Sequence, residues 1–104
     1  MILTTTPTIS EREIAQTLGV VRGATVRTKH VGTDIVASLK NLVGGELTGY
    51  SSLLAGAREQ AVDRMIEDAK NMGADAVVGL RFEASAVMSG ASELMAYGTA
   101  VKLK

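Results

Sequence analysis

The chain lacks cysteine and tryptophan, and its 104 residues include one histidine, one proline and only 3% aromatics. Without cysteine there can be no disulfide, no thiol nucleophile and no thiolate metal ligand. A Ser-His-Asp set would have to use His30, and no nucleophile-elbow sequence is present. The core must be built from Ala, Val, Leu, Ile and Met, which bury less surface per side chain than aromatic residues do.

The chain also lacks an excess of either charge, because 11 Lys and Arg balance 11 Asp and Glu. No net positive field draws it toward nucleic acid or anionic lipid. No segment approaches the ~20 apolar residues that a membrane helix needs, and the opening MILTTTPTIS does not have the pattern of a signal peptide. We therefore expect a cytoplasmic protein with neither a nucleic-acid nor a membrane partner.

The length predicts a single domain over residues 1–104. A domain of this size buries roughly 65% of the surface that its unfolded chain exposes, which leaves a modest core. Burial between subunits is one remedy for a small core. The composition therefore already favours self-association.

Four segments have the patterns of β-strands. Residues 2–6 predict an edge or terminal strand closed by Pro7. Residues 13–28 predict a long strand, with Gly19 or Gly23 permitting a bulge. For residues 10–18 a rival interpretation stays open, a helix that starts at a capping box over Ser10–Glu13. Residues 74–87 and 93–103 predict the last two strands, which are joined by a turn at Ser89-Gly90.

Two segments have helical periodicity. The first spans residues 34–43, begins at Thr33-Asp34 and ends at the paired glycines 44 and 45. The second begins at Ser51 or Ser52 and ends at Gly73, the expected left-handed C-terminal cap. It carries an apolar stripe of small residues and methionine, and Arg64 with Asp68 forms a favourable i,i+4 pair on the opposite side.

The faces of the last two strands differ. The strand over residues 74–87 alternates strictly, which predicts one apolar and one wet face. Its apolar set is Ala76, Val78, Leu80, Phe82, Ala84 and Ala86.

The last strand has two apolar faces, and a strand of that kind is covered on both sides. We expect the two helices on one side and a second copy of the chain on the other; the alternative is a closely packed face within one chain. The two sets are Met95, Tyr97, Val101 and Leu103 on one face, and Leu94, Ala96, Gly98 and Ala100 on the other.

The stretch GGELTGYS, residues 44–51, comes close to the phosphate-loop pattern G-x-x-x-x-G-K-[ST]. Tyr50 stands where that pattern requires lysine, and Glu46 adds charge of the wrong sign for a phosphate. The stretch is also expected to follow a helix, whereas a phosphate loop follows a strand. We interpret it as a corner in which Gly49 lets the chain reverse before Ser51.

Four residues in connecting segments are the candidate ligand-binding set: His30, Asp34, Glu46 and Tyr50. As a metal ligand, His30 would need carboxylates or further copies of the chain to complete the set. Thioethers of Met65, Met72, Met88 and Met95 could bind a soft ion, but core filling explains methionines on a helix stripe better. The absence of an acid/base or nucleophile pair favours a non-catalytic oligomeric binding module. The alternative is an enzyme whose active site forms between subunits at these four residues.

Read as a whole, the chain resembles the YbjQ-like family of small bacterial and archaeal proteins, which carries a heavy-metal-binding label. The resemblance rests on TTTP (4–7), LGVVRG (18–23), Asp34, VGG (43–45), Tyr50, GADAVVG (73–79) and GTAV (98–101).

The resemblance implies an α+β fold, β-β-α-α-β-β, with an antiparallel sheet and two helices packed on one face. It also implies a homo-oligomeric ring, commonly a pentamer, and it favours strand over helix for residues 10–18. A metal ion is the cofactor that the label implies, with the metal and its ligands unknown. The chain departs from the usual family pattern at Glu46 and Ser51, where members often have an arginine and an acidic residue.

Overall fold

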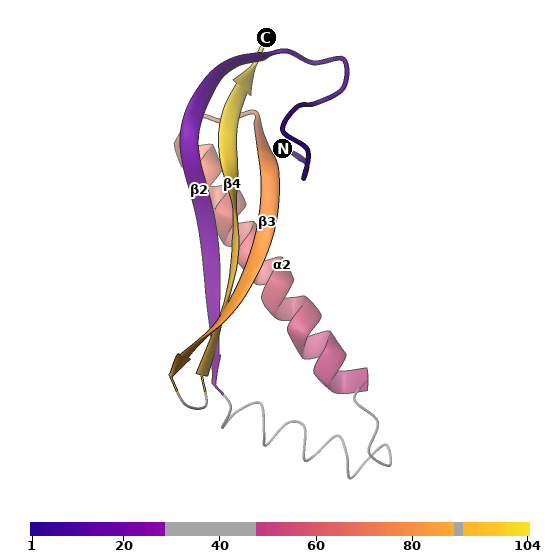
Figure 1. Cartoon of the computed structure of the whole chain (residues 1–104), viewed down its shortest axis with the longest axis vertical. Coiled ribbons are helices and arrows are strands. Elements are labelled where there is room, and N and C mark those ends of the chain that lie inside the picture. The colour runs from indigo at the N-terminus through magenta and orange to yellow at the C-terminus, as the bar shows by residue number, and fades with distance from the viewer. Residues whose placement is uncertain (29–47, 89–90) are drawn as a thin grey trace.

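The computed structural model describes residues 1–28, 48–88 and 91–104. Its elements in chain order are β1 (Ile2–Leu3), β2 (Ile14–Thr28), α2 (Thr48–Asn71), β3 (Ala76–Met88) and β4 (Ala91–Leu103). The four strands form one sheet in the order β1-β3-β4-β2, and α2 crosses one face of it (Figure 1). The α+β class is confirmed. The described residues contain one helix rather than two, since the helix expected over residues 34–43 lies outside them.

The sheet is mixed rather than wholly antiparallel. β2 and β3 both run antiparallel to β4, as predicted, but β1 runs parallel to β3, with Ile2 beside Ala76 and Leu3 beside Val77. A parallel neighbour needs a long connection, and β2 and α2 both lie between β1 and β3 in the sequence. β1 is an edge strand as predicted, although it ends at Leu3 instead of Thr6.

Residues 14–28 form the long strand β2, so the rival helix over residues 14–18 is wrong. Pairing with β4 shifts between Thr17 and Gly19, and Gly19 has a φ of 136° that side chains rarely adopt. Of the two glycines that were predicted to permit a bulge, Gly19 is therefore the one located at the bulge. Gly23 pairs regularly with Ala96 and has another role, described below.

Helix α2 starts at Thr48, three residues before the predicted cap at Ser51. Gly49 therefore lies inside the helix, and the prediction that it reverses the chain is wrong. Glycine lowers the helix propensity of a segment but does not exclude a helical position. The C-terminal end follows the prediction: Gly73 has a φ of 78°, its N–H donates to Lys70 O, and the N–H of Ala74 donates to Ala69 O. These two bonds make a Schellman cap.

A bulge in β3 divides the face that the sequence pattern predicted as continuous. Gly79 has a φ of 64°, and the pairing with β4 shifts between Val78 and Arg81. An extra residue in one strand exchanges the two faces for everything that follows. Before the bulge Val77 packs toward α2, whereas after it Leu80 does so. Ala76 and Val78 therefore face away from the helix, and the predicted shared face is wrong at this point.

The main core lies between α2 and the sheet and consists largely of small side chains. Its buried members are Val21, Ala61, Met65, Ala69, Val77, Ala96 and Ala100. The helix sits unusually close to β2 because Gly23 has no side chain: a Cβ there would collide with backbone atoms of Ala61, Arg64 and Met65. The predicted stripe of small residues thus permits close helix-to-sheet packing.

β4 has two apolar faces, as predicted. Its small face, with Ala96 and Ala100 buried, packs on α2. On the opposite face Val101 is buried beneath Ile9 and Ile14, which belong to the N-terminal part of the chain. Farther along that face Met95 and Tyr97 are only half-buried. The chain itself therefore covers one end of the second face.

Two side chains of α2 cover part of the open edge of β2. The N–H of Arg22 donates to the Asp68 carboxylate at 3.3 Å, and the Arg64 guanidinium donates to Ala24 O. Arg64 and Asp68, which were predicted to pair with each other, each form a hydrogen bond with the backbone of β2. Covering an edge strand in this way hinders its pairing with another chain.

Thr25 is a buried polar residue among the described residues, and its hydroxyl donates to Ala57 O at 3.2 Å. We expect Thr25→Val to keep the shape and lower the free energy of unfolding by about 1 kcal/mol, the usual net value of such a bond. Urea unfolding at fixed protein concentration measures it. Thr17→Val, at an exposed position of the same strand, is the control and should change stability by less than about 0.5 kcal/mol. Equal effects would refute the role of the bond.

Candidate functional site

The described residues hold only part of the ligand set expected from the sequence. His30, Asp34 and Glu46 lie outside them, and so do residues 44–47 of the corner. Tyr50 lies in the first turn of α2. The proximity of these four residues therefore stays a prediction.

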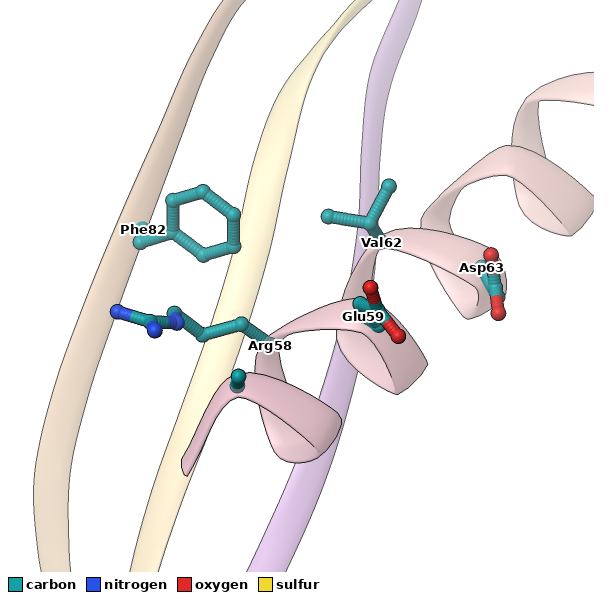
Figure 2. A pocket seen from close by; sticks show the side chains of 6 residues that line it. Arg58, Glu59, Val62, Asp63 and Phe82 are labelled. Carbon is teal, nitrogen blue, oxygen red and sulfur yellow. The ribbon is translucent and has the colours of Figure 1, made fainter. Parts of the chain in front are cut away.

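A shallow, largely open groove lies between α2 and β3 (Figure 2). Its volume is about 660 Å³. One strand residue, Phe82, forms one wall. The helix supplies the rest: Ala55, Arg58, Glu59, Val62 and Asp63.

The groove exists because α2 lies over β2 and β4 and diverges from β3 toward its own N-terminal end (Figure 1). The close contact at Gly23 holds the middle of the helix over β2. The bulge at Gly79 then turns Phe82 to the helix side of the sheet, where α2 leaves it partly uncovered. The Phe82 side chain consequently stays 44% exposed, although a large aromatic side chain ordinarily contributes much buried area to a core.

The walls of the groove combine an apolar surface with both signs of charge. The Phe82 ring and Val62 face the opening, and the Arg58 side chain extends toward the ring (Figure 2). The carboxylates of Glu59 and Asp63 lie along the helix on the other side of Val62. Such a surface suits an extended or flat group with an apolar body and polar margins. Among the described residues no three His, Asp or Glu side chains gather closely enough to hold a metal ion.

Sequence reasoning missed the groove because it misplaced the residue of β3 that forms one wall. It placed Phe82 on a buried strand face, because the pattern of alternation does not reveal the bulge at Gly79. It placed Arg58, Glu59 and Asp63 on the wet side of the helix, which is right, since all three are exposed. The sequence around Phe82 held no signal for its exposure, because the charged neighbours Arg81 and Glu83 point to the opposite face of a strand and therefore predict an inward phenylalanine.

Fold and groove together define a class: a small α+β domain in which helix α2 covers part of a mixed sheet and leaves an open groove beside β3. No helix in the described ranges is long and apolar enough to cross a membrane. The chain belongs to the YbjQ family, whose model, described as "Putative heavy-metal-binding", matches residues 1–104.

Relatives from archaea and bacteria match the chain over nearly its full length. A UPF0145 protein of Methanosarcina acetivorans is 58% identical over 99% of this chain and 97% of its own. One from Archaeoglobus fulgidus is 59% identical over 100% and 96%, and one from Vibrio campbellii is 55% identical over 99% of each. The family that the sequence resembled is therefore confirmed.

A solved structure supports the fold. A protein of unknown function from Pediococcus pentosaceus, assigned to the DUF74 family, superposes with a TM-score of 0.65. The alignment covers 100% of this chain and 98% of the other at 15% sequence identity. At that identity the likeness concerns the fold alone.

Proposed function

We propose that the chain is the subunit of a non-catalytic homo-oligomeric binding module, which holds a heavy-metal ion or a small ligand where subunits meet. The observation that carries this proposal is the open sheet face opposite α2. Val20 is 72% exposed and Val26 is 55% exposed there, beside the half-buried Met95 and Tyr97. Apolar side chains that stay exposed on a sheet face, with no second layer over them among the described residues, are typical of a surface that another chain covers.

Several copies of the chain would provide the ligands. A metal in a protein needs about four donors, and His30 supplies one imidazole per chain. In a ring, the same residue from each subunit can face a common axis, so His30, with Asp34, Glu46 and Tyr50 near it, forms the proposed site. The heavy-metal description of the family supports the choice of a metal ion. Because the chain has no cysteine, nitrogen and oxygen donors with methionine sulfur are the ligands available.

A ring of five subunits is the assembly that we propose, by resemblance to the family. The neutral net charge of the chain supports close approach of identical copies, since no net repulsion separates them. The small core of a chain with 3% aromatic residues adds a reason for burial between subunits.

Native mass spectrometry on untagged, chelator-treated protein tests both parts of the proposal. We expect an assembly of five chains at micromolar concentration and uptake of Zn²⁺ or Cu⁺ in a fixed ratio to the assembly, with binding confirmed by calorimetry. His30→Ala should abolish uptake and keep the assembly, whereas the neighbouring Lys29→Ala should keep both. Free monomer at these concentrations would refute the oligomeric module, and a lack of binding by either ion would refute the metal site.

A further inference from the structure

The Arg58 side chain lines the groove and extends from α2 toward β3 (Figure 2). Other arginines beside the sheet are bound to it: Arg64 donates to Ala24 O, and Arg81 donates to Thr5 O. Arg58 makes no hydrogen bond or ion pair with another residue of the described ranges. Within this part of the chain its guanidinium N–H donors are therefore unused, and they can bind another molecule.

An apolar surface lies next to this guanidinium. The Phe82 ring is 44% exposed, and Val62 is half-buried on the facing side of the helix. Both side chains face the same opening (Figure 2). An exposed aromatic ring favours a second ring in an offset-stacked or edge-to-face arrangement. The groove thus presents an aromatic surface and a positive charge to the same molecule, and its volume of about 660 Å³ is in the range of small-molecule sites.

The position of the guanidinium decides the sign of the charge that the groove accepts. Arg58 extends toward the Phe82 ring, whereas Glu59 and Asp63 lie on the other side of Val62 (Figure 2). A molecule whose apolar body covers the ring therefore meets Arg58 first among the charges of the groove. A carboxylate fits this position, because a guanidinium can donate two parallel hydrogen bonds to it. The two helix carboxylates oppose a second negative charge on the same molecule.

We propose that the groove binds a small, planar aromatic monocarboxylate. The ring of the ligand stacks on Phe82 and contacts Val62, and its carboxylate pairs with Arg58. Glu59 and Asp63 disfavour ligands with two negative charges. Because the groove is open on one side, we expect a dissociation constant of about 1 mM. One chain supplies all of these residues, so the inference goes beyond the metal site and the assembly proposed above and depends on neither.

Phe82 provides a reporter for this site, since it is the only phenylalanine of the chain. In untagged protein with ¹³C-labelled phenylalanine, the ring signals in an NMR spectrum come from the groove alone. We expect 2-naphthoate to shift these signals saturably. The doubly charged 2,6-naphthalenedicarboxylate and the cationic 2-naphthylmethylamine should each bind at least about threefold more weakly, because the first is repelled by the helix carboxylates and the second by Arg58.

A pair of variants with the same charge change tests the role of Arg58. We expect Arg58→Gln to weaken the binding of 2-naphthoate about three- to tenfold, since ion pairs that stay accessible to solvent contribute modestly even when they are bidentate. Lys70→Gln removes a positive charge from an exposed position in the last turn of α2, far along the helix from the groove, and should leave binding unchanged. Glu59→Gln should bring the affinity for the dicarboxylate closer to that for 2-naphthoate. Circular dichroism verifies that each variant is folded.

Three results would overturn the aromatic carboxylate site. They are the absence of a saturable shift at about ten times the expected dissociation constant, equal affinity for 2-naphthoate and the amine, and equal weakening by Arg58→Gln and Lys70→Gln. None of them bears on the subunit number or on metal uptake. Conversely, a monomeric protein without metal binding would refute the function proposed above and leave this groove as it stands.

Discussion

Replacing Gly23 with valine is expected to lower the free energy of unfolding by about 3–5 kcal/mol, toward the upper end of single-residue effects. A Cβ at this position would overlap backbone atoms of Ala61, Arg64 and Met65. Backbone in the middle of a helix cannot move aside as a flexible side chain can. The whole of α2 would have to rise from β2, and every contact beneath it would loosen. Against a typical total of about 5–15 kcal/mol, a change of this size threatens the fold itself.

Urea unfolding at one fixed protein concentration measures this effect, since self-association would make stability depend on concentration. Gly56→Ala is the control on the helix itself. Nothing lies within 4 Å of a Cβ built at Gly56, so this change should stabilise the protein by up to about 1 kcal/mol through helix propensity. Gly23→Ala should act in the same direction as Gly23→Val. A Gly23→Val protein as stable as the wild type would show that α2 does not rest on β2 as described.

The elements with long and regular patterns could be predicted from the sequence. The predicted helix stripe is buried at Ala57, Ala61, Met65 and Ala69, whereas its last predicted member, Met72, lies beyond the helix and is 38% exposed. The two apolar faces of β4 are also confirmed, since the small one packs on α2. These predictions succeeded because each pattern runs over several turns or pleats without interruption, so the periodicity alone decides which side faces the core.

The remaining features depend on contacts that the local pattern does not contain. The bulge at Gly79 involves hydrogen bonds to Thr4 and Thr6, more than 70 residues earlier in the sequence, and it exchanges the faces of β3. The parallel pairing of β1 is likewise a long-range choice. At the site, Phe82 followed from neither motif nor spacing, because its exposure results from the bulge and from the divergence of α2. The stability and the groove thus depend on the same two features, the contact at Gly23 and the bulge at Gly79.

The core that Gly23 brings together makes a strong prediction for Met65. This side chain is fully buried, and most of the other buried residues of its core cluster are alanines: Ala61, Ala69, Ala96 and Ala100. We expect Met65→Ala to lower the free energy of unfolding by about 3–5 kcal/mol, the upper part of the range for buried methionine or leucine. The cost depends on how well the surroundings collapse into the cavity, and alanines have no long side chains to move into it.

Met72→Ala provides the matched control, because it removes the same atoms just beyond the C-terminal end of α2, at a position that is 38% exposed. It should cost less than about 1 kcal/mol, while Met65→Leu, which nearly conserves volume, should cost less than about 1.5 kcal/mol. Thermal and urea unfolding of the three variants at equal concentration give the comparison. If Met65→Ala and Met72→Ala were equally stable, the alanine-lined core would have to be adaptable rather than rigid. The core would then not hold α2 close to β2 at Gly23. A helix that can shift to fill a cavity at Met65 can also shift to make room for a side chain at position 23.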